Sequence, residues 1–125
     1  MKGIVINPDN RLTVKDFDAP LYKSVGDAVD GWIEIVHPGG LKDPFVMIVN
    51  DEGLIKGLPW NVAGCLLYGT PVHGSPIVGN IVIMKEGWTD DGKDLLGLSE
   101  EEIAKITNKI DALLRCSGRT LKTEN

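Results

Sequence analysis

Five side chains with the chemistry to bind a small molecule fall within residues 58–74. They supply an indole, an amide, a phenol, a hydroxyl and an imidazole at short spacing. Aromatic rings stack on flat bases, and the intervening glycines let a ligand approach the backbone closely. The segment therefore predicts a nucleotide-binding pocket or, in a simpler interpretation, core and rim aromatics separated by turn glycines. The five residues are Trp60, Asn61, Tyr68, Thr70 and His73.

Three residues outside this segment are candidates to complete the pocket: Trp88, Arg115 and Arg119. The guanidinium group of arginine pairs bidentately with a phosphate. In this hypothesis Trp60 or Tyr68 stacks on the base, while the amide and hydroxyl of the segment contact its polar edges. The expected ligand is therefore a small nucleotide.

No residue pattern indicates a catalytic group or a metal site. The two cysteines lie far apart, and neither histidine has a second histidine at helical spacing, whereas a structural zinc site needs about four close ligands. Cys65 lies in an apolar segment and is expected to be buried, whereas Cys116 is expected at the surface. We therefore expect no metal and no cofactor. The remaining catalytic hypothesis is a hydrolase in which His73 acts with a nearby carboxylate.

The charge distribution argues against nucleic acid as a partner. The chain has 125 residues and a formal net charge of -5, and its arginines are Arg11, Arg115 and Arg119 alone. Nucleic-acid binding relies on basic groups that displace counterions from phosphates, so we expect no DNA or RNA partner. Carboxylates gather between residues 86 and 102, which predicts either a protein-docking surface or a solvated face.

The first third of the chain has the pattern of a hairpin followed by a helix. Lys2–Ile6 and Arg11–Phe17 flank a turn rich in Asn, Pro and Asp, which is typical of two antiparallel strands. Apolar residues recur at helical spacing from Leu21 to Val29, and Gly31 follows as a stop signal.

Three apolar segments then predict an antiparallel meander. They are Trp32–Val36, Phe45–Val49 and Leu54–Lys56, of which the middle segment is apolar enough to be buried on both faces. A short helix is expected from Pro59 to Leu67, and Gly69–Gly79 is expected to be a loop.

The remainder predicts one strand and one long helix. Ile77–Met84 is apolar and predicts the strand, and Gly87–Gly97 is expected to be an acidic loop. Ser99 and Glu102 have the spacing of a capping box at a helix start. Apolar residues then recur on one helix face until Gly118.

These elements predict an α+β protein. We expect a small curved antiparallel sheet, made of the N-terminal hairpin, the meander and one later strand, with two short helices and a C-terminal amphipathic helix. Residues 1–119 are expected to form one domain and residues 120–125 a frayed polar tail. No apolar run reaches the ~18–20 residues that span a bilayer, and residues 1–8 lack a signal pattern. We therefore expect a cytoplasmic protein with no membrane partner.

Six short motifs carry a family resemblance: Lys2–Asp9, Gly31–Val36, Val49–Gly53, Gly57–Asn61, Leu67–Gly69 and Pro76–Ile83. Together they resemble a family of small uncharacterised proteins carried by bacteriophages, plasmids and conjugative elements. The resemblance covers residues 2 to about 84 and leaves out the acidic segment and the last helix. It implies a mobile-element protein in a host cytoplasm, a setting in which small acidic proteins block host defences by binding.

Three functions from different classes follow. The leading hypothesis is a non-enzymatic anti-defence protein that sequesters a nucleotide signal of the cyclic dinucleotide or cyclic ADP-ribose type. We expect it to be a homo-oligomer with sites near subunit interfaces. The alternative is an interaction module that docks a host protein through acidic residues 86–102. The third is a hydrolase that cleaves the nucleotide.

Overall fold

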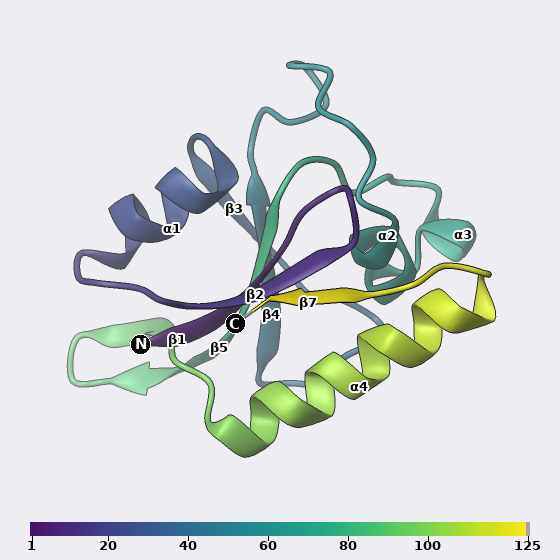
Figure 1. Ribbon diagram of the computed structural model, residues 1–125. Coiled ribbons are helices and arrows are strands. Elements are labelled where there is room, and N and C mark those ends of the chain that lie inside the picture. The colour runs from purple at the N-terminus through teal and green to yellow at the C-terminus, as the bar shows by residue number, and fades with distance from the viewer. Residues whose placement is uncertain (125) are drawn as a thin grey trace.

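Seven strands form one open, mixed sheet in the computed structural model, which describes residues 1–124 apart from the side chain of His73 (Figure 1). Their order across the sheet is β3-β4-β5-β1-β2-β7, and β6 pairs with the far end of β5. Every pair is antiparallel except β2 with β7, so the sheet is mixed where an antiparallel one was expected. The strands are β1 (Lys2–Ile6), β2 (Arg11–Asp16), β3 (Ile33–Val36), β4 (Phe45–Asn50), β5 (Ile81–Thr89), β6 (Gly92–Leu96) and β7 (Lys122–Glu124).

Helices in the described residues cover both faces of the sheet and produce three layers. One face packs against α1, the other packs against α2 and α4, and α3 follows α2 directly (Figure 1). This arrangement confirms the predicted α+β class. Within the described residues, no helix has both the length and the apolar character needed to cross a bilayer. The helices are α1 (Leu21–Val29), α2 (Val62–Tyr68), α3 (Thr70–His73) and α4 (Glu100–Cys116).

The strand β4 is apolar on both faces because it is covered on both sides. Met47 and Val49 pack toward α2 and α4, whereas Val46 and Ile48 pack toward α1. Successive side chains of a strand point to opposite faces, so a strand in the middle layer must be apolar throughout. The predicted two-sided burial of this segment is confirmed.

The start of α4 confirms the predicted capping box. The Ser99 hydroxyl accepts a hydrogen bond from the Glu102 backbone N–H at 3.2 Å, and the Glu102 carboxylate accepts one from the Ser99 N–H at 2.9 Å. The helix then runs to Cys116, and its apolar face is buried against the sheet. Local sequence signals were therefore sufficient to predict where this helix begins and which face it buries.

The prediction of a third meander strand at Leu54–Lys56 is wrong. The chain makes successive turns there: the Asn50 side chain accepts from the Glu52 N–H at 2.8 Å, and the Lys56 N–H donates to the Glu52 carbonyl at 2.9 Å. The neighbour of β4 is instead β5, which comes later in the chain. A short apolar run after a turn resembles a strand, but β5 takes the pairing edge that this run would have needed.

The acidic segment Gly87–Gly97 forms a hairpin and not the expected loop. The end of β5 pairs with β6, with Trp88 opposite Lys93 and Glu86 opposite Leu95, and Leu95 is buried. Pairing with β6 also explains why β5 extends to Thr89, beyond the predicted end of the strand. Glycine and carboxylates suggested a loop because their strand propensity is low, and backbone pairing overrides that propensity here.

The expected frayed tail, residues 120–125, contains a short strand in its described part, and residue 125 lies outside the described residues. Lys122–Glu124 form β7, which runs parallel to β2 and pairs Leu12 with Thr123. An ion pair of 2.6 Å between Arg11 and Glu124 accompanies the pairing. The strand forms because β2 presents an unpaired edge, which composition alone does not reveal.

Candidate functional site

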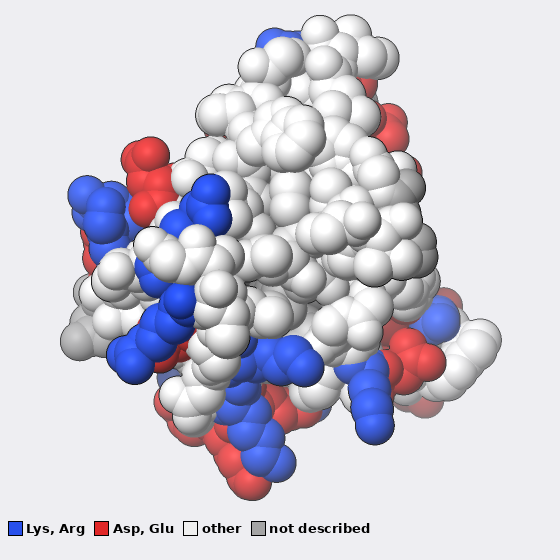
Figure 2. Space-filling model, turned by 90° about the vertical axis from the view of Figure 1, so that its right-hand side faces the viewer, with Lys and Arg blue, Asp and Glu red and all other residues white. Residues whose placement is uncertain are grey.

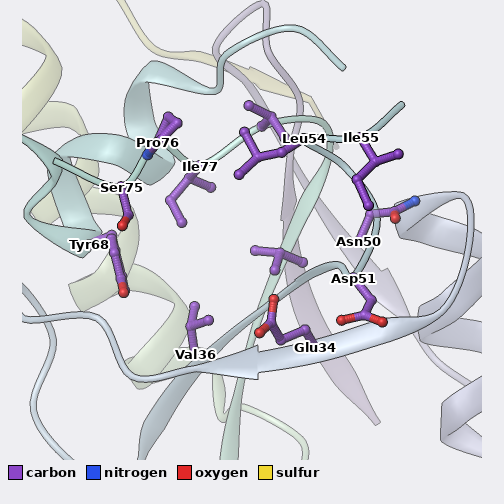
Figure 3. Close-up of a pocket in the computed structure, with 12 residues that line it drawn as sticks. Glu34, Val36, Asn50, Asp51, Leu54, Ile55, Tyr68, Ser75, Pro76 and Ile77 are labelled. Atoms are coloured by element: carbon purple, nitrogen blue, oxygen red, sulfur yellow. The ribbon is translucent and has the colours of Figure 1, made fainter. Parts of the chain in front are cut away.

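A cavity of about 390 Å³ lies on the face of the sheet that carries α2 and α4. It lies between β3, the end of β4, the turns that follow β4 and the chain segment before β5 (Figure 3). Its walls are mostly apolar. The main apolar wall residues are Val36, Val49, Leu54, Ile55, Ile77 and Val78.

Two carboxylates, from Glu34 and Asp51, line the same cavity. Glu34 lies opposite Val49 in the β3–β4 ladder, and Asp51 follows Val49 by two residues, so the two acids are diagonal neighbours on one face. Both are exposed, and neither forms an ion pair within the described part of the chain. The cavity is therefore acidic as well as apolar, and it suits a ligand that carries positive charge or hydrogen-bond donors.

Among the predicted pocket residues whose side chains the structure describes, Tyr68 alone lines this cavity. It is the last residue of α2, and Gly69 ends the helix in the left-handed conformation with a φ of 92°. The phenol lies at the end of the cavity near Ser75 and Val36, away from Asp51 and Ile55 (Figure 3). The role of Tyr68 as a ligand contact stays a prediction.

Asn61 has a structural role and does not face a ligand site, where it was expected. Its side chain is fully buried, and its Nδ2 donates to the carbonyls of Ile6 at 3.0 Å and Gly79 at 2.9 Å. Its Oδ1 accepts the backbone N–H of Gly64 at 2.9 Å, which caps α2. These contacts occupy three of the four hydrogen-bonding positions of the amide, so little remains for a ligand.

Trp60 and Thr70, from the same 58–74 set, do not lie around one ligand. Trp60 is 61% exposed and forms an isolated bridge with Val78. Thr70 donates its hydroxyl hydrogen bond to the Ser75 carbonyl at 2.7 Å, which closes the turn after α2. The backbone of His73 ends α3, and its side chain lies outside the described part of the structure.

The three residues expected to complete the pocket are also separated. Trp88 lies on the β5–β6 hairpin, away from α2 (Figure 1), beside a second hollow lined by His37 and Lys93. Arg115 pairs with Asp111 of its own helix at 3.1 Å. Arg119 donates to the Ser117 carbonyl at 3.1 Å. The eight predicted residues thus occupy several separate places.

A wide uncharged surface adjoins the cavity. No Asp, Glu, Lys or Arg occurs anywhere from residue 57 to residue 84. We call the surface of residues 57–80 the uncharged face; its most exposed apolar side chains are Trp60, at 61%, and Val72, at 84%. Figure 2 looks onto the side that carries α2 and α3 and shows a broad area without charged side chains beside charged margins. This long uncharged run is visible in the sequence, but the overall fraction of charged residues does not reveal it.

The acidic segment 86–102, in contrast, satisfies much of its charge internally. Glu86 lies 3.1 Å from the His37 ring and 3.5 Å from the Lys93 ammonium, and Glu102 pairs with Lys85 at 2.9 Å. The hydrogen bond from the Ser99 backbone, and then Lys85, hold the pKa of Glu102 below its usual range. These carboxylates stabilise the hairpin and the helix start.

The fold and the cavity together define a small α+β protein with an acidic, apolar-walled pocket at the edge of an open sheet. The chain belongs to the family DUF3846, described as a domain of unknown function, whose model matches residues 1–111. The match extends past the expected resemblance, because it includes the β5–β6 hairpin and most of α4. Comparison with curated proteins and with solved structures gives no match for this chain.

Proposed function

We propose that this protein is an interaction module that binds another protein through the uncharged face and the adjoining cavity. The observation that carries the proposal is the exposure of Trp60 and Val72 on a segment that has no charged side chain. Broad exposed surface without charge marks an interaction site more often than scattered apolar side chains do. Interfaces are depleted in charge at their centre, and tryptophan is over-represented among the residues that contribute most binding energy.

The position of the cavity supports the same proposal. Val78, which pairs with Trp60, also lines the cavity, so the apolar surface continues into a concave site. Leu54 and Ile55 are 63% and 85% exposed at the cavity rim. A pocket surrounded by apolar side chains accommodates an anchor residue of a partner and excludes water around it.

A capture experiment with matched variants tests the proposal. Wild type, the double variant Trp60→Ser/Val72→Ser and the control Tyr22→Ser are used as baits in a lysate of the organism that carries the gene. Tyr22 is 69% exposed on α1, on the opposite face of the sheet. We expect a protein that wild type and the control retain and the double variant loses, and titration calorimetry with that purified protein then measures the affinity. Equal affinity for all three baits, or no captured protein, overturns the proposal.

Sequestration of a nucleotide stays a prediction. The negative charge of the cavity favours it less than it favours the binding of another protein. The carboxylates of Glu34 and Asp51 repel phosphates, since like charges in a partly desolvated site interact strongly. Thermal unfolding against linear and cyclic nucleotides separates the two functions. A ligand at a hundredfold excess over its Kd stabilises the folded state by about 2.7 kcal/mol. Recovery of the ligand unchanged favours sequestration, and recovery of a cleaved product favours the hydrolase.

The biological setting belongs to the same set of proposals. Carriage by a phage or another mobile element, an anti-defence role and a cytoplasmic location rest on the resemblance of the six motifs. A second copy of this chain is one candidate partner for the uncharged face, as the expected homo-oligomer implies. Sedimentation equilibrium of wild type and Trp60→Ser/Val72→Ser distinguishes self-association from binding of a different protein.

A further inference from the structure

The geometry points to an arginine side chain of the partner as the occupant of the acidic cavity, presented by an extended segment that adds to the open edge of β3. The inference rests on the proposed function and specifies the chemistry of the partner. It starts from two independent features, the pair of carboxylates in an apolar cavity and the unpaired edge of the neighbouring strand.

The unpaired edge determines how a partner segment can approach. β3 is the first strand of the sheet and pairs only with β4, so one row of its backbone N–H and C=O groups has no strand partner among the described residues. Such an edge accepts an extended peptide as an additional strand. β3 lies directly beside the cavity, because Glu34 and Val36 belong to its lining.

Strand geometry then places a side chain of that peptide next to the carboxylates. In an added strand, the residue opposite Glu34 shares its face of the sheet, which is the face of the cavity. That residue therefore lies beside Glu34, and a long side chain at this position extends past Glu34 toward Asp51, which lies one strand further in. The residues on either side of it in the peptide point to the other face, so of the positions that face the cavity the one opposite Glu34 lies nearest the carboxylates.

The lining of the cavity favours arginine at that position. The aliphatic stem packs on Val36 and Val49, while the guanidinium group meets carboxylates that lack ion-pair partners in the described structure. Its planar array of donors contacts two carboxylates at once, whereas the lysine ammonium is a single point of charge. The phenol ring of Tyr68, which lines the same cavity, adds an aromatic surface.

The probe is a capped five-residue peptide with alternating valine and threonine around a central arginine. Its control replaces arginine by citrulline, which keeps the shape and removes the charge. NMR titration of the ¹⁵N-labelled full chain at physiological salt measures the affinity and maps the contact. We expect the arginine peptide to shift the amide resonances of Ile33–Val36 and Asp51. The citrulline peptide should bind at least about tenfold more weakly. Equal affinity of the two peptides, no binding of the arginine peptide, or shifts confined to other elements overturn the inference.

Variants separate this inference from the proposed function. Glu34→Gln/Asp51→Asn removes both charges from exposed positions, and Glu52→Gln removes a neighbouring exposed charge that does not line the cavity. We expect the first to lose the preference for arginine over citrulline and the second to keep it; a preference that persists in the first variant refutes the inference. If the capture test with Trp60→Ser/Val72→Ser fails but wild type still prefers the arginine peptide to the citrulline peptide, only the role of the uncharged face as an interface is rejected.

Discussion

The side chain of Asn61 is joined to Gly79 by a hydrogen bond of 2.9 Å from its Nδ2 to the Gly79 carbonyl. This bond connects the start of α2 to the turn that precedes β5. The same amide donates to Ile6 of β1, so one buried side chain holds the helix, the turn and the sheet together. Asn61, which was expected to contact the polar edges of a ligand, therefore supports the wall of the cavity instead.

Replacement of Asn61 by alanine is expected to destabilise the fold. The change removes the cap of α2 and leaves the buried carbonyls of Ile6 and Gly79 without their donor. We expect a loss of about 3 kcal/mol in the free energy of unfolding, measured by urea titration. Asn80→Ala is the control, because Asn80 is only half-buried and donates one bond of 3.2 Å, to Ala28. Equal losses for the two variants contradict the role given to Asn61.

Gly64 is expected to tolerate no side chain. A Cβ at this position in α2 would lie 2.7 Å from Cγ2 of Ile77 and 3.2 Å from Cδ1 of Ile81. Gly64→Ala should therefore cost about 1–3 kcal/mol, despite the better helix propensity of alanine. Gly39→Ala serves as the comparison, since its nearest contact is an ordinary 3.6 Å to the Tyr68 carbonyl. Chemical unfolding measures both, and a stabilised Gly64→Ala protein would show that the packing is looser than described.

The charge of Glu102 should make stability depend on pH. The Ser99 backbone bond and Lys85 lower its pKa from the usual 4.5, so the folded protein favours the ionised carboxylate. The resulting stabilisation is present above pH ~4.5 and is lost as the pH falls through the lowered pKa of the folded state. We expect the difference in unfolding free energy between wild type and Glu102→Gln to be larger at pH 7 than at about pH 3.

The control for this titration is Glu101→Gln. Glu101 has 80% side-chain exposure, and its ion pair with Lys105 joins neighbouring turns of α4. Exposed pairs of this kind contribute little. Glu101→Gln should therefore cost little stability at pH 7, and a Glu102 difference that is the same at both pH values would contradict the assignment.

The two cysteines should differ in reactivity toward an alkylating reagent. Cys116 is exposed at the end of α4, whereas Cys65 is 7% exposed and its Sγ accepts the Ile77 N–H at 3.3 Å. Mass spectrometry of the native protein after iodoacetamide treatment should find one label, on Cys116. Labelling of both residues should require denaturant, and rapid native labelling of Cys65 would show that α2 opens readily.

The elements that the sequence predicted well are those set by local signals. Ser99 and Glu102 cap α4 because both partners lie within one helical turn. The apolar run of β4 has only one interpretation, burial on both faces. The failures concern distant pairings: Leu54–Lys56 lacks a partner because β5 occupies its place, and β7 exists only because β2 is near in space.

The candidate site was harder to predict for the same reason. Tyr68 was proposed as a candidate because it is aromatic, and its side chain lines the cavity. Glu34 is a single acid within an apolar strand, and Asp51 follows the next strand, so their proximity depends on the register of β3 with β4. That register places the two acids together across the sheet, and neither residue type nor spacing along the chain contains this information.

The position of β5 has a consequence for how the chain folds during synthesis. β5 is the one strand that joins the β1–β2 pair to the β3–β4 pair, with Ile83 opposite both Ile4 and Met47. On the ribosome, these two pairs must therefore wait with unpaired apolar edges until residues 81–89 leave the exit tunnel. Chaperone binding to the nascent chain should be strongest in this interval and fall once β5 has emerged, because the aggregation-prone edges are then covered.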